Sequence, residues 1–262
     1  MKNKRELRLE LILEYLETNH SATVIGLSEA FRVSKTTIRQ DLDELYGRGR
    51  LIRTHGGAVP VSSNPLAALP LCPMPRDEDI PHLSAKKALA REAVKLIRED
   101  DSIFLGGGST FYILAKYLKP YRNLNVVTTN ISAVYELAPY LDHIYFIGGE
   151  LVEMDGIYYT GGPKLPLELD KVFVNKAFVG VSGIDLNAGL TIYDLTQFSM
   201  YTSVRSIANE IILLCDWSKF GHQSAHRIGT IQGFAGTVIT NRKTAPEYTD
   251  ALRKMGIRLL TA

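Results

Sequence analysis

The polar and basic run SKTTIRQ carries side chains that can read the edges of DNA bases. Gln can pair with adenine, Arg or Lys with guanine, and Thr with a thymine methyl group or a phosphate. If Ile38 faces a core, helical geometry points Thr36 and Gln40 away from it, with Lys35 and Arg39 on one flank. Taken alone, the same pattern also suits an ordinary surface helix. The predicted DNA contacts are Ser34, Lys35, Thr36, Thr37, Arg39 and Gln40.

This run needs a helix with one apolar side to hold it in place. Ser34 is a good N-cap, because its hydroxyl can accept from the free amides of the first turn. Ile38, Leu42 and Leu45 recur at i, i+4 and i+7, which places them on one face. The spacing therefore predicts a helix that begins at Ser34 and runs to about Tyr46.

The elements around that helix complete a DNA-binding arrangement. Apolar spacing predicts helices over residues 5–17 and 24–31, and turn residues bound two predicted strands over 51–54 and 58–61. Three helices followed by a hairpin describe a winged helix-turn-helix, whose third helix enters the major groove. The hairpin is the wing, and its predicted DNA contacts are Arg53 and His55.

The basic charge is local. Over 262 residues the formal net charge is only +2. Between residues 32 and 53, however, six basic residues stand against three acidic ones. Such a segment can meet phosphates without a basic protein around it. We therefore expect double-stranded DNA as a partner of this segment.

The first part of the chain also resembles a known family. The run from Arg5 to Ala58, and especially VSKTTIRQDLDEL followed by GRLIRTHGGA, resembles the N-terminal domain of DeoR-type bacterial transcriptional regulators. The resemblance implies that the partner is operator DNA and that the helix at the VS motif reads it. The family commonly has Arg where Gln40 stands, so the resemblance implies a different operator preference at that position.

Bulk composition is that of an ordinary globular protein, with 45% hydrophobic and 22% charged residues. Cys72 and Cys215 match no metal spacing and no disulfide framework, which fits a reducing compartment. The start of the chain lacks an apolar signal core, and no apolar run approaches the ~20 residues of a membrane span. We expect a cytoplasmic protein with no metal, no cofactor and no membrane partner.

A proline-rich stretch divides the chain. Four prolines lie between Pro60 and Pro81, and proline this dense removes amide donors and blocks helix formation. We predict a winged helix-turn-helix domain over residues 1–60, a partly extended linker over 61–81, and an α/β domain over 82–262.

The third segment alternates between strand and helix patterns. Helices are predicted from near His82, over 109–118 and over 132–141. Strands are predicted over 102–105, 125–128, 144–147, within 171–181, and over 210–214, 237–240 and 257–260. This alternation predicts a mostly parallel sheet covered on both faces. Ligands of such sheets bind at the carboxyl ends of the strands.

Those strand ends are rich in glycine and polar residues. The run GGGST joins a predicted strand to a helix, where backbone amides and hydroxyls can hold phosphate. Lys219 could bind a phosphate and Asp216 a sugar hydroxyl, although a tight turn, a helix cap or a surface ion pair would explain each feature equally simply. The predicted effector site is Gly106, Gly107, Gly108, Ser109, Thr110, Thr129, Asn130, Gly148, Gly149, Gly183, Asp185, Asp216 and Lys219.

This segment also resembles the C-terminal domain of the DeoR family, which looks like the ribose-5-phosphate isomerase and CoA-transferase fold. The resemblance implies a sensor for a phosphorylated sugar that relieves repression. Gly106 and Phe111 replace the Asp and the last Thr of the family loop, and Gln197 and Tyr201 stand where the family often has Glu and Lys. A pocket with fewer carboxylates and one amine less should prefer a different ligand and suits isomerisation poorly. Phe198 and Tyr201 could equally be core residues.

Three functions remain in competition. The first is a regulator, most simply a repressor of a carbohydrate-utilisation operon, that acts as a homodimer or homotetramer and is not an enzyme. The second is an isomerase-like enzyme fused to a DNA-binding module. Turnover of ribose 5-phosphate would support this second function. The third is a DNA-binding regulator whose ligand pocket has degenerated, an alternative that the changes at Gly106 and Phe111 keep open.

Overall fold

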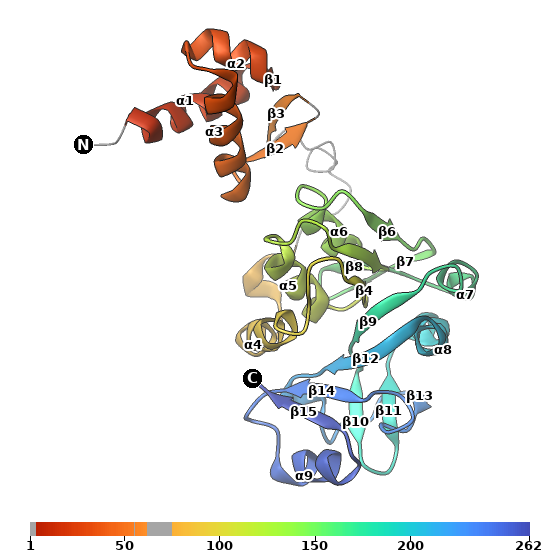
Figure 1. The fold of residues 1–262 in the computed structure, drawn as a ribbon. Coiled ribbons are helices and arrows are strands. Elements are labelled where there is room, and N and C mark those ends of the chain that lie inside the picture. Colours follow the sequence, from red (N-terminus) through yellow and green to blue (C-terminus); the bar gives the residue numbers. More distant parts are fainter. Residues whose placement is uncertain (1–3, 55, 62–74) are drawn as a thin grey trace. The chain divides into compact units, whose positions relative to one another are not determined.

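The structure is a computed structural model that describes residues 4–54, 56–61 and 75–262. The chain divides into two compact units, with the division between Leu71 and Cys72 (Figure 1). The first unit carries three helices and a small sheet in its described part, and the second carries a larger α/β fold. We describe each unit by itself.

The first unit is a winged helix-turn-helix, as the sequence predicts. Its helices are α1 (Lys4–Asn19), α2 (Val24–Phe31) and α3 (Lys35–Gly47), and its strands are β1 (Ala22–Thr23), β2 (Leu51–Thr54) and β3 (Gly57–Pro60). The strands form an antiparallel sheet in the order β1-β3-β2. Ile38, Leu42 and Leu45 of α3 are buried against α1 and α2, which confirms the predicted apolar face.

Capping fixes the turn between α2 and α3. Arg32 ends α2 in the left-handed conformation, with φ of 52°, and its amide donates back to the last turn. Ser34 then caps α3, where its hydroxyl accepts from the Thr37 amide at 3.1 Å. The two caps satisfy helix-end amides that would otherwise be unpaired, and they set the sharp bend of a helix-turn-helix.

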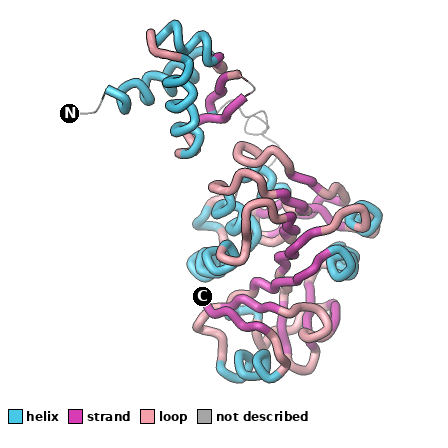
Figure 2. The backbone as a smooth tube through the Cα atoms, viewed as in Figure 1, coloured by secondary structure: helices cyan, strands magenta, loops and turns pink. Residues whose placement is uncertain are grey.

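A seven-stranded parallel sheet forms the centre of the second unit, in the order β15-β14-β12-β9-β4-β5-β6. Helices lie along it, as the tube in Figure 2 shows. The strands are β4 (Ser102–Leu105), β5 (Asn125–Thr128), β6 (Ile144–Phe146), β9 (Val174–Val179), β12 (Ala208–Leu214), β14 (Thr237–Thr240) and β15 (Arg258–Thr261). The helices are α4 (Leu83–Val94), α5 (Ser109–Leu118), α6 (Ile131–Leu137), α7 (Leu165–Leu169), α8 (Phe198–Ile207) and α9 (Pro246–Lys254).

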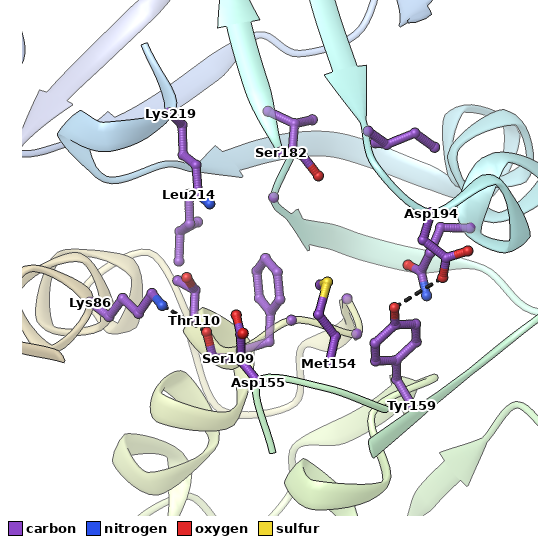
Figure 3. Close-up of a pocket in the computed structure, with 18 of the residues that line it drawn as sticks. Lys86, Ser109, Thr110, Met154, Asp155, Tyr159, Ser182, Asp194, Leu214 and Lys219 are labelled. Atoms are coloured by element: carbon purple, nitrogen blue, oxygen red, sulfur yellow. Dashed lines mark hydrogen bonds between the residues drawn. The ribbon is translucent and has the colours of Figure 1, made fainter. Parts of the chain in front are cut away.

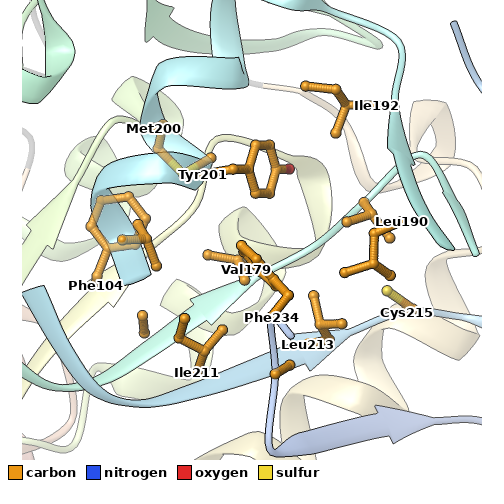
Figure 4. Packing of buried hydrophobic residues seen from close by; sticks show 14 of the residues in the cluster. Phe104, Val179, Leu190, Ile192, Met200, Tyr201, Ile211, Leu213, Cys215 and Phe234 are labelled. Atoms are coloured by element: carbon orange, nitrogen blue, oxygen red, sulfur yellow. The ribbon is translucent and has the colours of Figure 1, made fainter. Parts of the chain in front are cut away.

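Both faces of this sheet are buried. Along β9, Phe178 packs into the core under α4 and α5, whereas its neighbours Ala177 and Val179 pack into a second core with α8. Leu213 and Ile212 of β12 divide between the two cores in the same way, because successive strand residues face opposite sides. Figure 4 shows the α8 side, where aromatic and aliphatic side chains interlock. The predicted mostly parallel, doubly covered sheet is therefore confirmed.

Two smaller antiparallel sheets were not predicted. One joins β10 (Gly183–Asp185), β11 (Gly189–Ile192) and β13 (His226–Gly229). The other is a hairpin of β7 (Glu150–Met154) and β8 (Ile157–Gly161), turned by Asp155 and Gly156 with φ of 54° and 74°. An Asp-Gly pair suits such a turn, because both central residues need positive φ. The Asp-Gly pair was not identified as a hairpin turn in the sequence analysis.

Residues 75–81, the described end of the predicted linker, belong to the second unit and pack into it. Ile80 is buried in the core beside α4 and α5. Asp77 lies in a short 3-10 helix (Asp77–Asp79) and forms ion pairs with Lys87 and Lys116 at 2.8 and 2.7 Å. These cations hold the pKa of Asp77 at about 2. The packed part of the second unit thus begins before residue 82. Within the described residues, no helix combines the length and apolarity that a bilayer crossing needs.

Candidate functional site

The outward face of α3 presents most of the predicted DNA contacts to solvent. Lys35, Thr36, Arg39 and Gln40 are exposed. Ser34 and Thr37 are engaged in the cap, where their hydroxyls also lie 2.8 Å apart. The free face therefore carries two cations, one amide and one hydroxyl near a helix N-terminus, a set that can pair with base edges and phosphates.

The wing adds a third cation to this surface. Lys35, Arg39 and Arg53 line the same hollow between α3, the start of α2 and the wing. Arg53 Nε lies 3.2 Å from Asp43 Oδ1, and its Nη1 donates to the Gly57 carbonyl. The position of Arg53 is thus fixed by α3 and by the wing itself. His55, the other predicted wing contact, lies outside the described residues.

Asp41 has a role that the sequence reading missed. Its side chain is fully buried, and it accepts from Arg8 Nη2 at 3.2 Å and from Arg5 Nε at 3.3 Å. The hydrogen bond to Asp41 raises the pKa of Arg8. These contacts tie α1 to α3 and orient the exposed face of α3. The sequence did contain a signal for this role, because Asp41 is a charged residue at a position of the helix that faces the core.

In the second unit, a cavity opens at the carboxyl ends of three neighbouring strands, β12, β9 and β4 (Figure 3). It contains about 820 Å³ of space, counting its open mouth. Seven of the predicted effector residues line it together. They are Gly106, Gly107, Gly108, Ser109, Thr110, Asp216 and Lys219.

The glycine loop between β4 and α5 has no room for a side chain at Gly107. A Cβ on Gly107 would lie 2.9 Å from the ring of Tyr159, closer than real contacts allow. Gly108 precedes α5 without a side-chain cap, so the first amides of that helix are left for another acceptor. The helix N-terminus and the hydroxyls of Ser109 and Thr110 together favour an anion.

Lys86 is the principal site residue that the sequence reading missed. It lies on α4, is only 5% exposed and donates from Nζ to Ser109 Oγ at 2.8 Å. Its pKa is lowered to about 8, mainly by burial and also by Lys219, while Asp216 and Asp155 act in the opposite direction. Lys86 and Lys219 form no ion pair among the described residues, so this end of the cavity favours an anionic ligand. Nothing local in the sequence distinguishes Lys86 from Lys87.

Three carboxylates also line the cavity, and two of them, Asp155 and Asp194, were not among the predicted effector residues. Asp216 accepts from the Ser218 amide at 2.9 Å, and Asp155 comes from the tip of the β7–β8 hairpin. Asp194 accepts from the Tyr159 hydroxyl at 2.9 Å and from Thr196. Burial and Asp194 raise the pKa of Tyr159, so its hydroxyl stays a donor.

Gln197 and Tyr201, the positions that depart from the family, both line the cavity. Tyr201 is buried, and its hydroxyl donates a hydrogen bond to the Gly180 carbonyl. Its ring packs against that of Phe234, with the two ring centroids 5.8 Å apart. It is therefore both a core residue and part of the wall. Gln197 ends a short 3-10 helix (Leu195–Gln197), and its buried Nε2 has no hydrogen-bond partner in the described part of the chain.

The other predicted effector residues lie outside this cavity. Asn130 holds the glycine loop from behind, since its Nδ2 donates to the carbonyls of Gly106, Gly107 and Gly108 at 3.4, 3.0 and 3.2 Å. Asp185 accepts from two amides in its own turn, and these bonds lower its pKa.

The remaining predicted residues stand where main-chain segments meet closely. Thr129 is fully buried and its carbonyl accepts from Thr160. Added Cβ atoms on Gly149 and Gly183 would lie 2.4 and 2.3 Å from the carbonyl oxygens of other segments, so these two glycines permit a close approach of the main chain. Gly148 has open space around it.

Comparison with known proteins agrees with this division of the chain. Residues 8–64 match the DeoR-like helix-turn-helix domain, and residues 81–242 match the DeoR C-terminal sensor domain. The chain belongs to the DeoR family. It is therefore a DNA-binding transcriptional regulator with a DeoR-type sensor domain.

Relatives span nearly the whole length of this DeoR-family chain. The regulator YulB of Bacillus subtilis (strain 168) is 30% identical, with 96% of this chain and 95% of YulB covered. IolR of the same organism is 25% identical, with 93% and 94% covered. The glycerol-3-phosphate regulon repressor of Escherichia coli (strain K12) is 28% identical, with 87% and 88% covered.

Solved structures resemble the chain more remotely. Ribose 5-phosphate isomerase A from Methanocaldococcus jannaschii aligns over 55% of each chain, with 22% identity and a TM-score of 0.37.

Proposed function

We propose that this DeoR-family protein represses a carbohydrate-utilisation operon and that a phosphorylated sugar, bound in the second unit, controls its hold on operator DNA. The observation that carries the effector proposal is Lys86. The hydrogen-bond partner of this buried ammonium group among the described residues is the neutral Ser109 hydroxyl, and it forms no ion pair there, so an anionic ligand would stabilise its charge. Lys219, Thr110 and the amides that begin α5 converge on the same place and suit a phosphate.

The DNA proposal assigns a different task to each part of the first unit. Lys35, Arg39 and Gln40 reach base edges from the exposed face of α3, and Thr36 contacts a thymine methyl group or a phosphate. Ser34 and Thr37 hold the start of the helix, and Arg53 meets a phosphate from the wing. We place the protein in the cytoplasm as a homodimer or homotetramer, because helix-turn-helix operators are paired half-sites.

The site is proposed to bind its ligand without turnover. The carboxylates of Asp194 and Asp216 already accept hydrogen bonds from neighbouring protein groups. Gln197 and Tyr201 stand where the family often has Glu and Lys, so the site lacks that carboxylate as a proton acceptor and that amine. Incubation with ribose 5-phosphate should yield no ribulose 5-phosphate.

A direct test uses the single tryptophan of the chain. Trp217 does not itself line the cavity, but it lies between Asp216 and Lys219, which do, so we expect a ligand bound there to change its emission. We expect at least one phosphorylated sugar in a broad panel to change the emission saturably. The corresponding free sugar at the same concentration, and the same phosphate added to the Lys86→Met variant, should leave it unchanged. If no phosphorylated sugar changes the emission and none shows binding by calorimetry, the proposal is contradicted.

A further inference from the structure

The cavity has two chemically different ends. Figure 3 shows Lys86, Ser109 and Lys219 on one side, and Tyr159 and Asp194 on the other. The first end is where the proposed phosphate binds. The second end has to recognise whatever the phosphate is attached to, so its free polar groups identify the kind of ligand.

Most polar groups at the second end already have protein partners. Asp194 Oδ1 accepts from the Thr196 amide, and Asp194 Oδ2 accepts from the hydroxyls of Tyr159 and Thr196 at 2.9 and 2.6 Å. The Tyr201 hydroxyl donates to the Gly180 carbonyl. These groups shape the wall, but their hydrogen bonds are already made within the protein.

Gln197 is different. Its side chain is more than nine-tenths buried, it lines the cavity, and its Nε2 has no partner among the residues that the structure describes. Its main-chain amide donates to the Asp194 carbonyl at 3.2 Å, which places it at the Asp194 end. A buried amide donor without a partner costs free energy, and a ligand oxygen would relieve that cost.

We infer that Gln197 is the specificity residue of the effector site and that it donates to an uncharged oxygen, a hydroxyl or carbonyl, at the end of the ligand opposite the phosphate. This inference rests on the proposed function. A carboxylate at that end would be repelled by Asp194. An ammonium group would place donor against donor at Gln197 Nε2, whereas a hydroxyl or carbonyl oxygen can accept from it.

The test measures binding by Trp217 fluorescence in the full chain, with four classes of probe. Inorganic phosphate occupies the first end alone. Neutral sugar phosphates (ribose, glucose and fructose phosphates) add an uncharged far end, 6-phosphogluconate adds a carboxylate, and glucosamine 6-phosphate adds an ammonium group. We expect at least one neutral sugar phosphate to bind about tenfold more tightly than inorganic phosphate or its charged counterparts.

The Gln197→Leu variant should lose this tenfold advantage while keeping the wild-type affinity for inorganic phosphate. Retained phosphate binding shows that the variant is folded. Gln232→Leu is the matched control, because Gln232 is exposed, donates to the Met255 carbonyl and does not line the cavity. It should behave like the wild type.

Three outcomes would overturn the inference. If Gln197→Leu keeps the preference for the neutral sugar phosphate, Gln197 does not read the ligand. If inorganic phosphate binds but no neutral ester binds more tightly, the proposed function stands and the inference about the far end fails. If no phosphate compound binds at all, the proposed function fails as well.

Discussion

At the scale of single residues, Lys86 carries the clearest physical signature of ligand binding. Its pKa of about 8 lies below the ordinary value of 10.5 because burial opposes the charged form. The charged form therefore destabilises the unliganded fold at pH values below 8, and this cost is relieved as the pH rises from 8 to 10.5. A bound phosphate would remove the same cost at neutral pH by pairing with the ammonium group.

This reasoning predicts a pH dependence of effector binding. Affinity should fall by about tenfold as the pH rises above 8, because Lys86 loses the charge that attracts the phosphate. Binding titrations between pH 7 and pH 10 measure it. The phosphate is a dianion throughout most of that range, so it does not itself cause the fall. The Lys86→Arg variant keeps its charge and should show a flat profile. A flat wild-type profile would remove Lys86 from the phosphate site.

A second prediction concerns Arg39 on the exposed face of α3. The Arg39→Ala variant should bind operator DNA more weakly by about 1–3 kcal/mol if Arg39 meets a base or a key phosphate. A mobility-shift titration measures the change. Arg91→Ala, an exposed arginine on α4 of the second unit, is the control and should leave affinity unaltered. Equal affinities of the two variants for operator DNA would show that Arg39 does not contact the DNA.

Some of the residues that line the cavity could be predicted from the sequence, and others could not. Glycine, serine and threonine after a strand are visible as a local pattern, so the loop from Gly106 to Thr110 was predicted as part of the site. Lys86, Asp194 and Tyr159 reach the cavity from elements distant in sequence. Only the tertiary fold brings these three residues together, and no local sequence pattern predicts that they share a cavity.

At the scale of elements, the glycine loop depends on a single amide. Asn130 begins α6, accepts from the Ala133 amide at 2.9 Å, and donates to three successive carbonyls of the loop. Without it, the buried carbonyls of Gly106 and Gly107 would lose this donor, and the loop would relax. Asn130 thus positions the site although it does not line the cavity.

We therefore expect the Asn130→Ala variant to lose at least tenfold in effector affinity while operator binding without effector stays as in the wild type. Fluorescence titration and a mobility-shift assay measure the two quantities. Asn187→Ala, in an exposed turn, is the control. Wild-type effector affinity in the Asn130→Ala variant would show that the loop holds its shape without this amide.

The contact between α1 and α3 gives a prediction about stability. Replacing Asp41 by Ala leaves Arg5 and Arg8 without their buried acceptor and should destabilise the first unit by roughly 2–3 kcal/mol. Hydrogen exchange of the α1 and α3 amides in the full chain measures this. Asp43→Ala on the same helix removes only a solvent-exposed ion pair with Arg53, so its effect should stay below about 1 kcal/mol. Equal protection in the two variants would contradict the assigned role of Asp41.

Regular elements were predicted well because their patterns are local. The helices at 24–31 and 109–118 and the strands at 102–105 and 125–128 have the predicted bounds. The β7–β8 hairpin was missed because its strands carry exposed residues such as Leu151 and do not alternate cleanly. That hairpin brings Met154 and Asp155 to the cavity, so the missed element also hid part of the site.

At the scale of the whole molecule, the two units divide the work of a DeoR-family regulator. The first holds the proposed DNA-reading face, and the second holds the cavity proposed to bind the effector. An effector can change DNA binding only if it has different affinities for the DNA-binding and DNA-free states. Reciprocity then requires operator DNA to weaken effector binding by the same factor.

The central claim is tested most directly by measuring operator affinity in the presence of the effector. Operator DNA would first be selected from a random-sequence pool by binding to the unliganded chain. Saturation with the phosphorylated sugar that shifts Trp217 emission should weaken operator binding at least tenfold in the wild type and leave the Lys86→Met variant unaffected. Unchanged operator affinity in the wild type, with the effector demonstrably bound, would contradict the account.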